Sequence, residues 1–246
     1  MTTQRTALIT GSGQNIGRAI ALELASTGCN IILNGSSNQA ACEAVARDIE
    51  AMGSGVLIAM GDVGVRDNAL RIAESGIERF GGIDVLVNNA AIRPSFDLIH
   101  DDEADFHRIM DVNFYAALWL TRACLPHMVN NSWGRIINFT GMNAQQGYTG
   151  KSAVSISKHA SWALTKSIAK EYGRQGVTAN IISPGTIVGD DETPASSDQY
   201  IALAQQNPAG RLGEPADIAK MVGYLASDDA SFVNGQLMQV NGGVVV

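Results

Sequence analysis

Short apolar runs alternate with longer helical patterns along the first half of the chain. Runs of β-branched residues that alternate with helical segments are typical of βαβ units and of a parallel sheet. The same pattern continues toward the C-terminus. It predicts strands at Ala7–Thr10, Cys29–Asn34, Gly55–Met60, Ile83–Asn88, Arg135–Phe139, Val177–Ile182 and Gln236–Val240.

The segments between these runs carry apolar residues every three or four positions, as Ile16, Ala19, Ile20 and Leu24 do. This period predicts amphipathic helices. They are expected on the period that begins at Ile16 and at Asn38–Met52, Arg66–Phe80, Asp102–Leu125, Ser152–Tyr172 and Pro215–Leu225, with a looser region over Gly185–Pro208. We therefore expect an α/β fold: a single doubly wound domain over residues 1–246, with a parallel seven-stranded sheet, helices on both faces and right-handed crossovers.

Composition narrows the class of protein without changing this expectation. The chain is 46% hydrophobic and 17% charged, and its formal charge is 17 − 24 = −7. No dense Lys/Arg cluster indicates a nucleic-acid surface, and no apolar run reaches the roughly 18 residues of a membrane span. The three Cys are far apart and form no CxxC pair, so we expect reduced thiols, a cytoplasmic protein and no metal site.

The segment TGSGQNIG, from Thr10 to Gly17, resembles a phosphate-binding turn. A turn between a strand and a helix aims backbone N–H groups and the positive helix end at an anion. Asn15 stands where a glycine would let the backbone approach a pyrophosphate, but Asn tolerates a positive φ better than most residues. The alternative interpretation is a tight turn that serves folding alone. The position of Thr10–Gly17 directly after the first strand favours a nucleotide site over this alternative.

Three segments carry a family resemblance: the turn Thr10–Gly17, the strand end Asn88–Ala91 (NNAA) and the stretch Gly134–Lys158. They resemble TGxxxGxG, NNAG and GRIxNxSSxxGxxxxxGxxxYxxSK of the classical short-chain dehydrogenase/reductase family. The resemblance extends over essentially the whole chain. It implies a Rossmann-type domain and an NAD(P)-dependent carbonyl/alcohol oxidoreductase that acts on a small molecule and self-associates as a homotetramer or homodimer.

The resemblance also implies which residues hold the dinucleotide. They are Gly11, Gln14, Asn15, Ile16 and Gly17 in the turn, Asp62 and Val63 at the adenine, Asn89 and Ala90 at the adenosine, and Lys158, Pro184, Gly185 and Ile187 at the nicotinamide side. The second strand ends in Asn34–Ser37, which offers neither an acid for ribose hydroxyls nor a base for a 2′-phosphate. The cofactor is expected to be NADP or NAD, with a weak preference for NADP.

The resemblance places Asn113 and Lys158 in the catalytic machinery but leaves two of its positions without a hydroxyl. Val154 stands where the family has its proton-donating Tyr, and Gly141 where it has the Ser that holds the substrate carbonyl. Losing a positioned acid costs on the order of 10² to 10⁴ in rate. Tyr148 is the candidate replacement, although a cleft-wall aromatic is the simpler interpretation.

Weaker candidates adjoin these positions. Thr140 should point to the opposite face of its strand, Ser155 should project about 100° around the helix from Val154, and His159 should point elsewhere. Nearby, Gly189 replaces the Thr that the family uses for the carboxamide, and the acidic run Asp190–Glu192 follows it.

Three hypotheses remain open. The first is an oxidoreductase whose ordinary Tyr-dependent activity is impaired. The second is a lyase, hydrolase or isomerase on the same scaffold that uses Lys158 and Asn113, since a lysine in an apolar cleft can serve as a base or Schiff-base amine. The third is a non-catalytic binding or assembly subunit. Fold alone does not choose among them.

Overall fold

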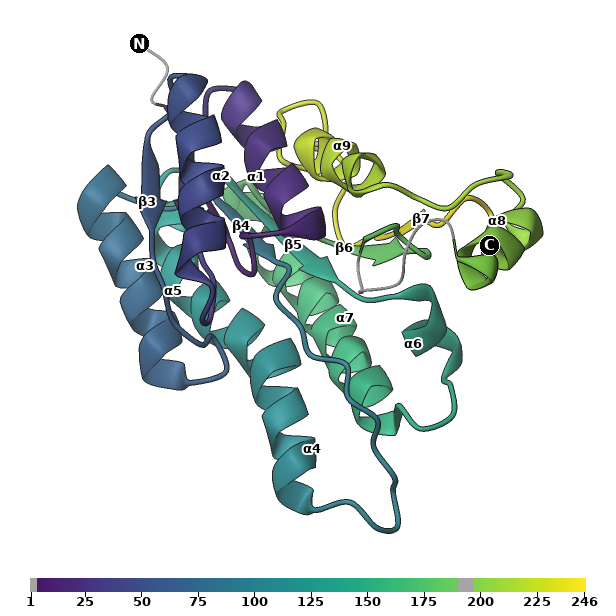
Figure 1. Cartoon of the computed structure of the whole chain (residues 1–246). Coiled ribbons are helices and arrows are strands. Elements are labelled where there is room, and N and C mark those ends of the chain that lie inside the picture. Colours follow the sequence, from purple (N-terminus) through teal and green to yellow (C-terminus); the bar gives the residue numbers. More distant parts are fainter. Residues whose placement is uncertain (1–3, 190–196) are drawn as a thin grey trace.

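A central sheet of seven parallel strands organises the computed structural model, which describes residues 4–189 and 197–246 (Figure 1). The strands lie in the order β3-β2-β1-β4-β5-β6-β7. The predicted doubly wound α/β fold is therefore confirmed. The strand bounds are β1 (Thr6–Ile9), β2 (Asn30–Leu33), β3 (Val56–Ile58), β4 (Val85–Asn88), β5 (Gly134–Phe139), β6 (Val177–Pro184) and β7 (Leu237–Val240).

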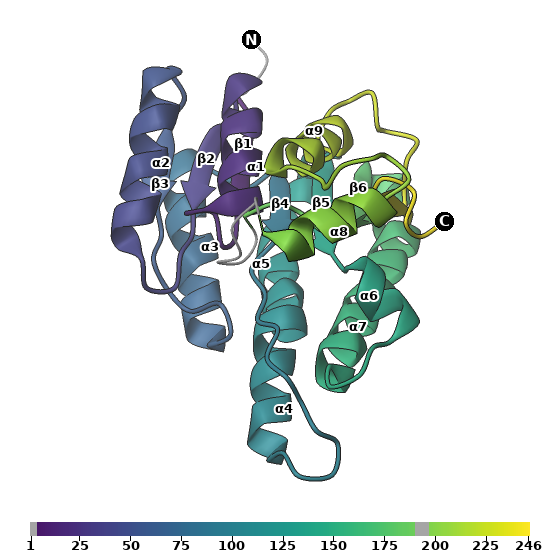
Figure 2. The same ribbon diagram turned by 45° about the vertical axis from the view of Figure 1, so that its right-hand side comes forward.

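Helices cover both faces of the sheet (Figures 1 and 2). On one face lie α1 (Asn15–Ser26), α2 (Gln39–Ala51) and α9 (Pro215–Leu225); on the other lie α3 (Arg66–Phe80), α5 (Ala116–Asn130) and α7 (Ser152–Tyr172). Successive strand residues point to opposite faces, so Ala7 and Ile9 pack under the first set while Leu8 packs under the second. Both faces of the central strands are buried, which is why these strands read as continuous apolar runs.

One long helical arm replaces the single helix expected over Asp102–Leu125. It consists of α4 (Glu103–Met110), a π-helical turn η1 (Asp111–Tyr115) and α5. The expected C-terminal bound was wrong, because the helix continues through Pro126 to Asn130. In Figure 2, α4 projects well below the sheet beside the connection that follows β4.

Two short helices lie in segments for which the sequence predicted no helix. They are α6 (Met142–Gln146), within the loop after β5, and α8 (Asp198–Gln206), within the region Gly185–Pro208. A short 3₁₀ turn, η2 (Gly173–Gln175), follows α7. Among the described helices, none combines the length and apolar character needed to cross a membrane.

Candidate active site

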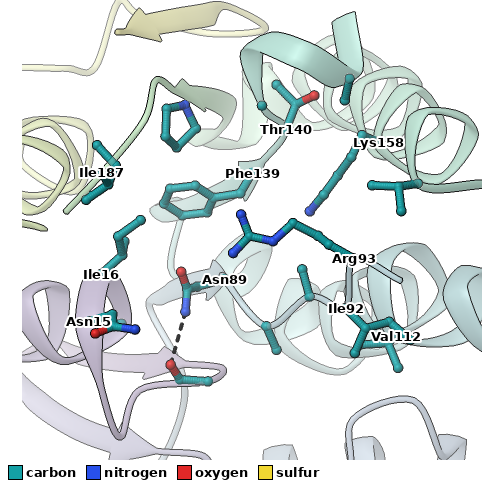
Figure 3. A pocket seen from close by; sticks show the side chains of 18 of the residues that line it. Asn15, Ile16, Asn89, Ile92, Arg93, Val112, Phe139, Thr140, Lys158 and Ile187 are labelled. Atoms are coloured by element: carbon teal, nitrogen blue, oxygen red, sulfur yellow. Dashed lines mark hydrogen bonds between the residues drawn. The ribbon is translucent and has the colours of Figure 1, made fainter. Parts of the chain in front are cut away.

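The carboxyl ends of β1, β4, β5 and β6 surround one cavity of about 670 Å³ (Figure 3). The chain changes direction across the sheet between β1 and β4, and ligands of doubly wound proteins bind at such switch points. Every residue that the sequence assigned to the cofactor lines this cavity: Gly11, Gln14, Asn15, Ile16, Gly17, Asp62, Val63, Asn89, Ala90, Lys158, Pro184, Gly185 and Ile187.

The turn between β1 and α1 is held close to the end of β4. The Asn89 side chain donates from Nδ2 to the carbonyl oxygens of Thr10 (2.9 Å) and Gly11 (3.1 Å). A Cβ atom at Gly17 would collide with the Gly11 carbonyl oxygen, so only glycine permits this approach. The turn is thus a rigid backbone cradle at the N-terminus of α1, suited to a phosphate group.

Asn15 adopts the left-handed conformation expected of it, with φ of 47°. Its side chain lies close to Gly189, because a Cβ built on Gly189 would lie 3.7 Å from Asn15 Oδ1. Gly189 itself has φ of 81°, a region that a β-branched residue enters only with strain. The backbone at position 189 therefore does not suit the Thr that the family carries there. The acidic run Asp190–Glu192 lies outside the described residues.

The end of the cavity beside Asp62 contains an ion pair that the sequence did not indicate. Arg108, on α4, donates to Asp62 Oδ2 at 2.6 Å, while Asp62 Oδ1 accepts from the Gly64 backbone N–H at 2.9 Å. Arg108 lies far from Asp62 in the sequence, so no local signal connects the two. Asn34 is buried and donates to the carbonyls of Ala59 and Gly61, both at 3.0 Å, so its amide group is held within the protein.

Gly141, Tyr148, Val154 and Lys158 all line the opposite end of the cavity. Lys158 is 6% exposed, and Val154, four residues before it on α7, is 2% exposed. Residues at this spacing share one helix face. Val154 belongs to a small apolar cluster with Phe96, Ile109 and Ala153. The position of the family's Tyr has thus become part of the core.

Gly141 differs from Val154 in having free space beside it. It precedes α6 in an extended conformation, with φ of −171°, and no atom lies within 4 Å of a Cβ built there. Of the weaker candidates, Thr140 lines the cavity, contrary to expectation. Thr140 directly follows the last residue of β5, at the carboxyl edge of the sheet where the cavity lies. Ser155 is not among the lining residues, and the exposed His159 ring contacts the Ser155 carbonyl.

Asn113 is not among the residues that line the cavity. It is 5% exposed and lies in η1, a π-helical turn of the kind often found at functional sites. Its side chain pairs with the backbone of Ile92, accepting from Ile92 N at 2.9 Å and donating to Ile92 O at 3.0 Å, and also donates to Ser157 Oγ at 3.1 Å. Its own carbonyl accepts from Ser161 Oγ at 3.1 Å. The side chain therefore positions the loop after β4.

Comparison with known proteins extends the likeness to nearly the full length of the chain. The family model described as enoyl-(acyl carrier protein) reductase matches residues 11–245. The 3-oxoacyl-[acyl-carrier-protein] reductase FabG of Haemophilus influenzae is 36% identical over 238 residues, covering 97% of each chain. The (2S)-[(R)-hydroxy(phenyl)methyl]succinyl-CoA dehydrogenase subunit BbsD of Thauera aromatica is 36% identical over 241 residues, covering 97% of this chain and 96% of the relative.

Solved structures show the same fold. A putative NAD(P)-dependent gluconate 5-dehydrogenase from Beutenbergia cavernae, with bound NADP at low occupancy, has a TM-score of 0.89 at 32% identity and covers 99% of this chain and 97% of its own. A blue fluorescent protein from a metagenomic library, in complex with NADPH, has a TM-score of 0.91 at 31% identity over 98% of each chain. Because sequence and fold agree over almost the entire length, the protein belongs to the classical short-chain dehydrogenase/reductase family.

Proposed function

We propose that the protein is an NAD(P)-dependent oxidoreductase that interconverts a carbonyl group and an alcohol on a small molecule. The observation that carries the proposal is a single cavity extending from the Gly11–Gly17 turn to Lys158. The named activities of the relatives and the nucleotides bound in the similar structures support the same class of reaction. NADP is the preferred cofactor, since no carboxylate stands at the end of β2 to repel a 2′-phosphate.

The residues of this chain suit the parts of such a cofactor. The Gly11–Gly17 turn would hold the pyrophosphate, Asp62 the adenine, and Gly185 with Ile187 the nicotinamide side. When bound, the cofactor supplies or accepts a hydride. The chain's part is to orient the reacting groups, to exclude water with the buried wall that includes Val154, and to move the accompanying proton.

Proton transfer is the step in which this protein departs from its family. Positions 141 and 154 carry no hydroxyl, so we propose that Tyr148 and Lys158, which line the same cavity, carry the proton at the reacting end. Asn113 supports them by fixing the loop after β4 rather than by contacting the ligand. Turnover should be slow compared with a family member that retains its positioned acid.

Titration with NADPH and NADH, followed by calorimetry, tests the proposal. We expect binding of at least one cofactor, with NADPH tighter. Gly17→Val serves as the site variant, because its side chain would collide with the Gly11 carbonyl and should weaken binding. Ala51→Val, at the exposed end of α2, is the matched control and should bind as the wild type does. No binding of either cofactor to the wild type at millimolar concentration would sink the proposal.

A second function is favoured by the surroundings of Lys158. The lysine is 6% exposed and has a valine rather than a phenol one helical turn away. A desolvated lysine can act as a base or as a Schiff-base amine, which would suit a lyase or isomerase. Borohydride trapping of a carbonyl compound on Lys158, located by peptide mass spectrometry, would support this function. Unchanged turnover by Lys158→Ala would refute it.

We further propose that the protein is cytoplasmic and self-associates as a homotetramer or homodimer through α5 and α7. Tyr115, just before α5, and Ile156, on α7, are exposed apolar residues in this region. Light scattering coupled to size-exclusion chromatography tests the oligomeric state. Tyr115→Glu with Ile156→Glu should shift the protein toward monomer. A purely non-catalytic assembly subunit would show the same association with no cofactor binding.

A further inference from the structure

Hydrogen bonds fix the backbone of the loop after β4 at two successive residues, Ile92 and Arg93. The Arg93 side chain lines the cavity. Ile92 is paired through both backbone groups with the Asn113 side chain, at 2.9 and 3.0 Å. The next carbonyl, that of Arg93, accepts from Lys151 Nζ at 2.6 Å. These contacts hold the backbone at Ile92 and Arg93 and so fix the point from which the Arg93 side chain begins.

The same loop is fixed again three residues further on. The Phe96 backbone N–H donates to the Gly150 carbonyl at 2.8 Å, and the Phe96 ring is buried in the cluster that includes Val154. The loop after β4 and the loop before α7 therefore form one wall of the cavity. Arg93, whose own carbonyl accepts from Lys151, lies between the anchored residues Ile92 and Phe96.

The Arg93 side chain lines the reacting end of the cavity together with Lys158. The residue is exposed, and Figure 3 shows its guanidinium group between Phe139 and Lys158. Two cationic side chains from different elements thus converge on the reacting end. A guanidinium binds a carboxylate through two parallel hydrogen bonds, which fixes orientation as well as charge.

The residues at positions 141 and 154 both change which groups the reacting end of the cavity can offer to a ligand. They remove two neutral hydroxyl donors, which would suit an uncharged carbonyl, and leave the two cations in place. Cationic side chains that line a cleft raise the local concentration of anions.

We propose that the substrate is a small carboxylate-bearing carbonyl compound or alcohol, whose carboxylate is bound by Arg93 with Lys158 beside it. This inference rests on the proposed oxidoreductase function for its reaction, but its binding part can be tested without turnover. Arg93 is then the residue that sets substrate class, and Asn113 and Lys151 are positioning residues for it.

The kinetic test compares oxo-carboxylates of three to six carbons with their methyl esters, using NADPH and the full chain. The wild type should prefer the acid over its ester in kcat/KM by about 10- to 100-fold, the value of one charge-assisted contact. In Arg93→Gln, kcat/KM for the acid should fall to about that for the ester, mainly through a higher KM for the acid. Arg93→Lys should retain part of the preference. Arg71→Gln, on the exposed face of α3, is the matched control and should behave as the wild type.

The binding test separates failure of this inference from failure of the proposed function. Calorimetry with the same acids is performed with and without NADPH, so a result is obtained even if no hydride transfer occurs. Weaker binding of the acids to Arg93→Gln than to the wild type supports the anion site whatever the reaction. Equal binding of acid and ester to the wild type, or tighter binding of a phosphate ester of the same size, overturns it.

Discussion

Gly141 and Val154 lack the family's hydroxyl groups under different physical circumstances. Gly141 has an extended backbone that any residue adopts, with free space where a side chain would begin. Val154 is packed against Phe96 and Ile109 in a small apolar cluster. One position is therefore open to a new side chain, whereas the other contributes to stability.

This contrast predicts opposite effects of substitution on stability. Gly141→Ser should change the free energy of unfolding by less than about 0.5 kcal/mol, as at other sites free of strain and contact. Val154→Tyr should lower it by about 1–3 kcal/mol, the usual cost of forcing a larger group into a packed cluster. Urea unfolding of the two single variants measures both values. Equal losses would contradict the assignment of Val154 to the core.

The double variant tests whether the missing hydroxyls limit the reaction. Gly141→Ser with Val154→Tyr should raise carbonyl reduction, by up to the order of 10² that a positioned acid contributes. Gly141→Ser with Val154→Phe is the matched control, since it adds the ring without the hydroxyl. A similar gain from both double variants would attribute the effect to cavity shape, and no gain from the Tyr variant would count against a disabled reductase.

Asn15 places an amide side chain at a position of the turn where the family has glycine. Because its φ is 47°, glycine relieves the strain of this conformation while removing the side chain from the cavity. We expect Asn15→Gly to bind NADPH more tightly than the wild type, and Asn15→Asp to bind it more weakly through repulsion of the phosphates. Calorimetry should therefore find the highest affinity for NADPH in Asn15→Gly, an intermediate affinity in the wild type and the lowest in Asn15→Asp. Weaker binding by the glycine variant would mean that the Asn15 amide contacts the cofactor.

At the scale of elements, α9 begins with a charged cap that connects it to the preceding loop. Asp217 accepts from the Glu214 backbone N–H at 2.8 Å and forms a bidentate pair with Arg211, at 2.7 and 2.8 Å. The hydrogen bonds from Arg211, and then that from the Glu214 backbone, lower the pKa of Asp217 from 3.8 to about 2. Because α9 packs directly on α1, loss of this cap should also weaken the packing of α1 on the same face of the sheet.

We expect Asp217→Ala to lower the free energy of unfolding by about 1 kcal/mol, as is usual when a capping side chain is removed. Asp217→Asn, which keeps an acceptor but not the charge, should lose less. A carboxyl group whose pKa is lowered on folding stabilises the protein above its unfolded value, and this contribution disappears as the pH falls through the folded value. The difference between the wild type and Asp217→Asn should thus be complete above about pH 4 and shrink toward about pH 2. Urea unfolding across this range measures it, and a pH-independent difference would contradict the charged cap.

The elements that the sequence predicted well are those with long, regular patterns. The bounds of α3, α7 and α9 match the expected ranges, and each strand lies within about one or two residues of its expected limits. The helix α6 has five residues, too short for a helical period to show. The helix α8 did leave a signal, because Ser197 caps it by accepting from Tyr200 N. The π-helical turn η1 depends on packing against α7, and hydrophobic periodicity does not report such packing.

At the scale of the whole molecule, the family spacing predicted the cavity but not the charges that converge on it. The turn Thr10–Gly17 and Lys158 could be paired from the sequence because the family pattern fixes their places in the fold. Arg93 and Arg108 could not be assigned in the same way. Their neighbours, Lys158 and Asp62, come from distant segments, and only the folded sheet brings these side chains together.

The three cysteine thiols are buried, and they lie on both faces of the sheet. Cys29 packs with the core on the side of α1, and Cys124 with the core on the side of α5, while Cys42 is buried in α2. Burial raises the pKa of Cys124 to about 12, and it also raises the pKa of Cys29 and Cys42. The thiolate is the reactive form, so none of the three should react with a thiol reagent in the native protein near neutral pH.

If residues 1–246 form a single domain, as the sequence predicts, all three thiols should become reactive together. Labelling with a short pulse of maleimide at increasing urea, followed by intact mass, distinguishes proteins with zero, one, two or three modified cysteines, and peptide mass mapping identifies which of them carry the label. We expect unmodified and triply modified protein with little between them, because one cooperative transition exposes both faces of the sheet. Labelling of Cys124 at a lower urea concentration than Cys29 would show instead that the α3–α5–α7 face opens independently, and the single-domain prediction would be wrong.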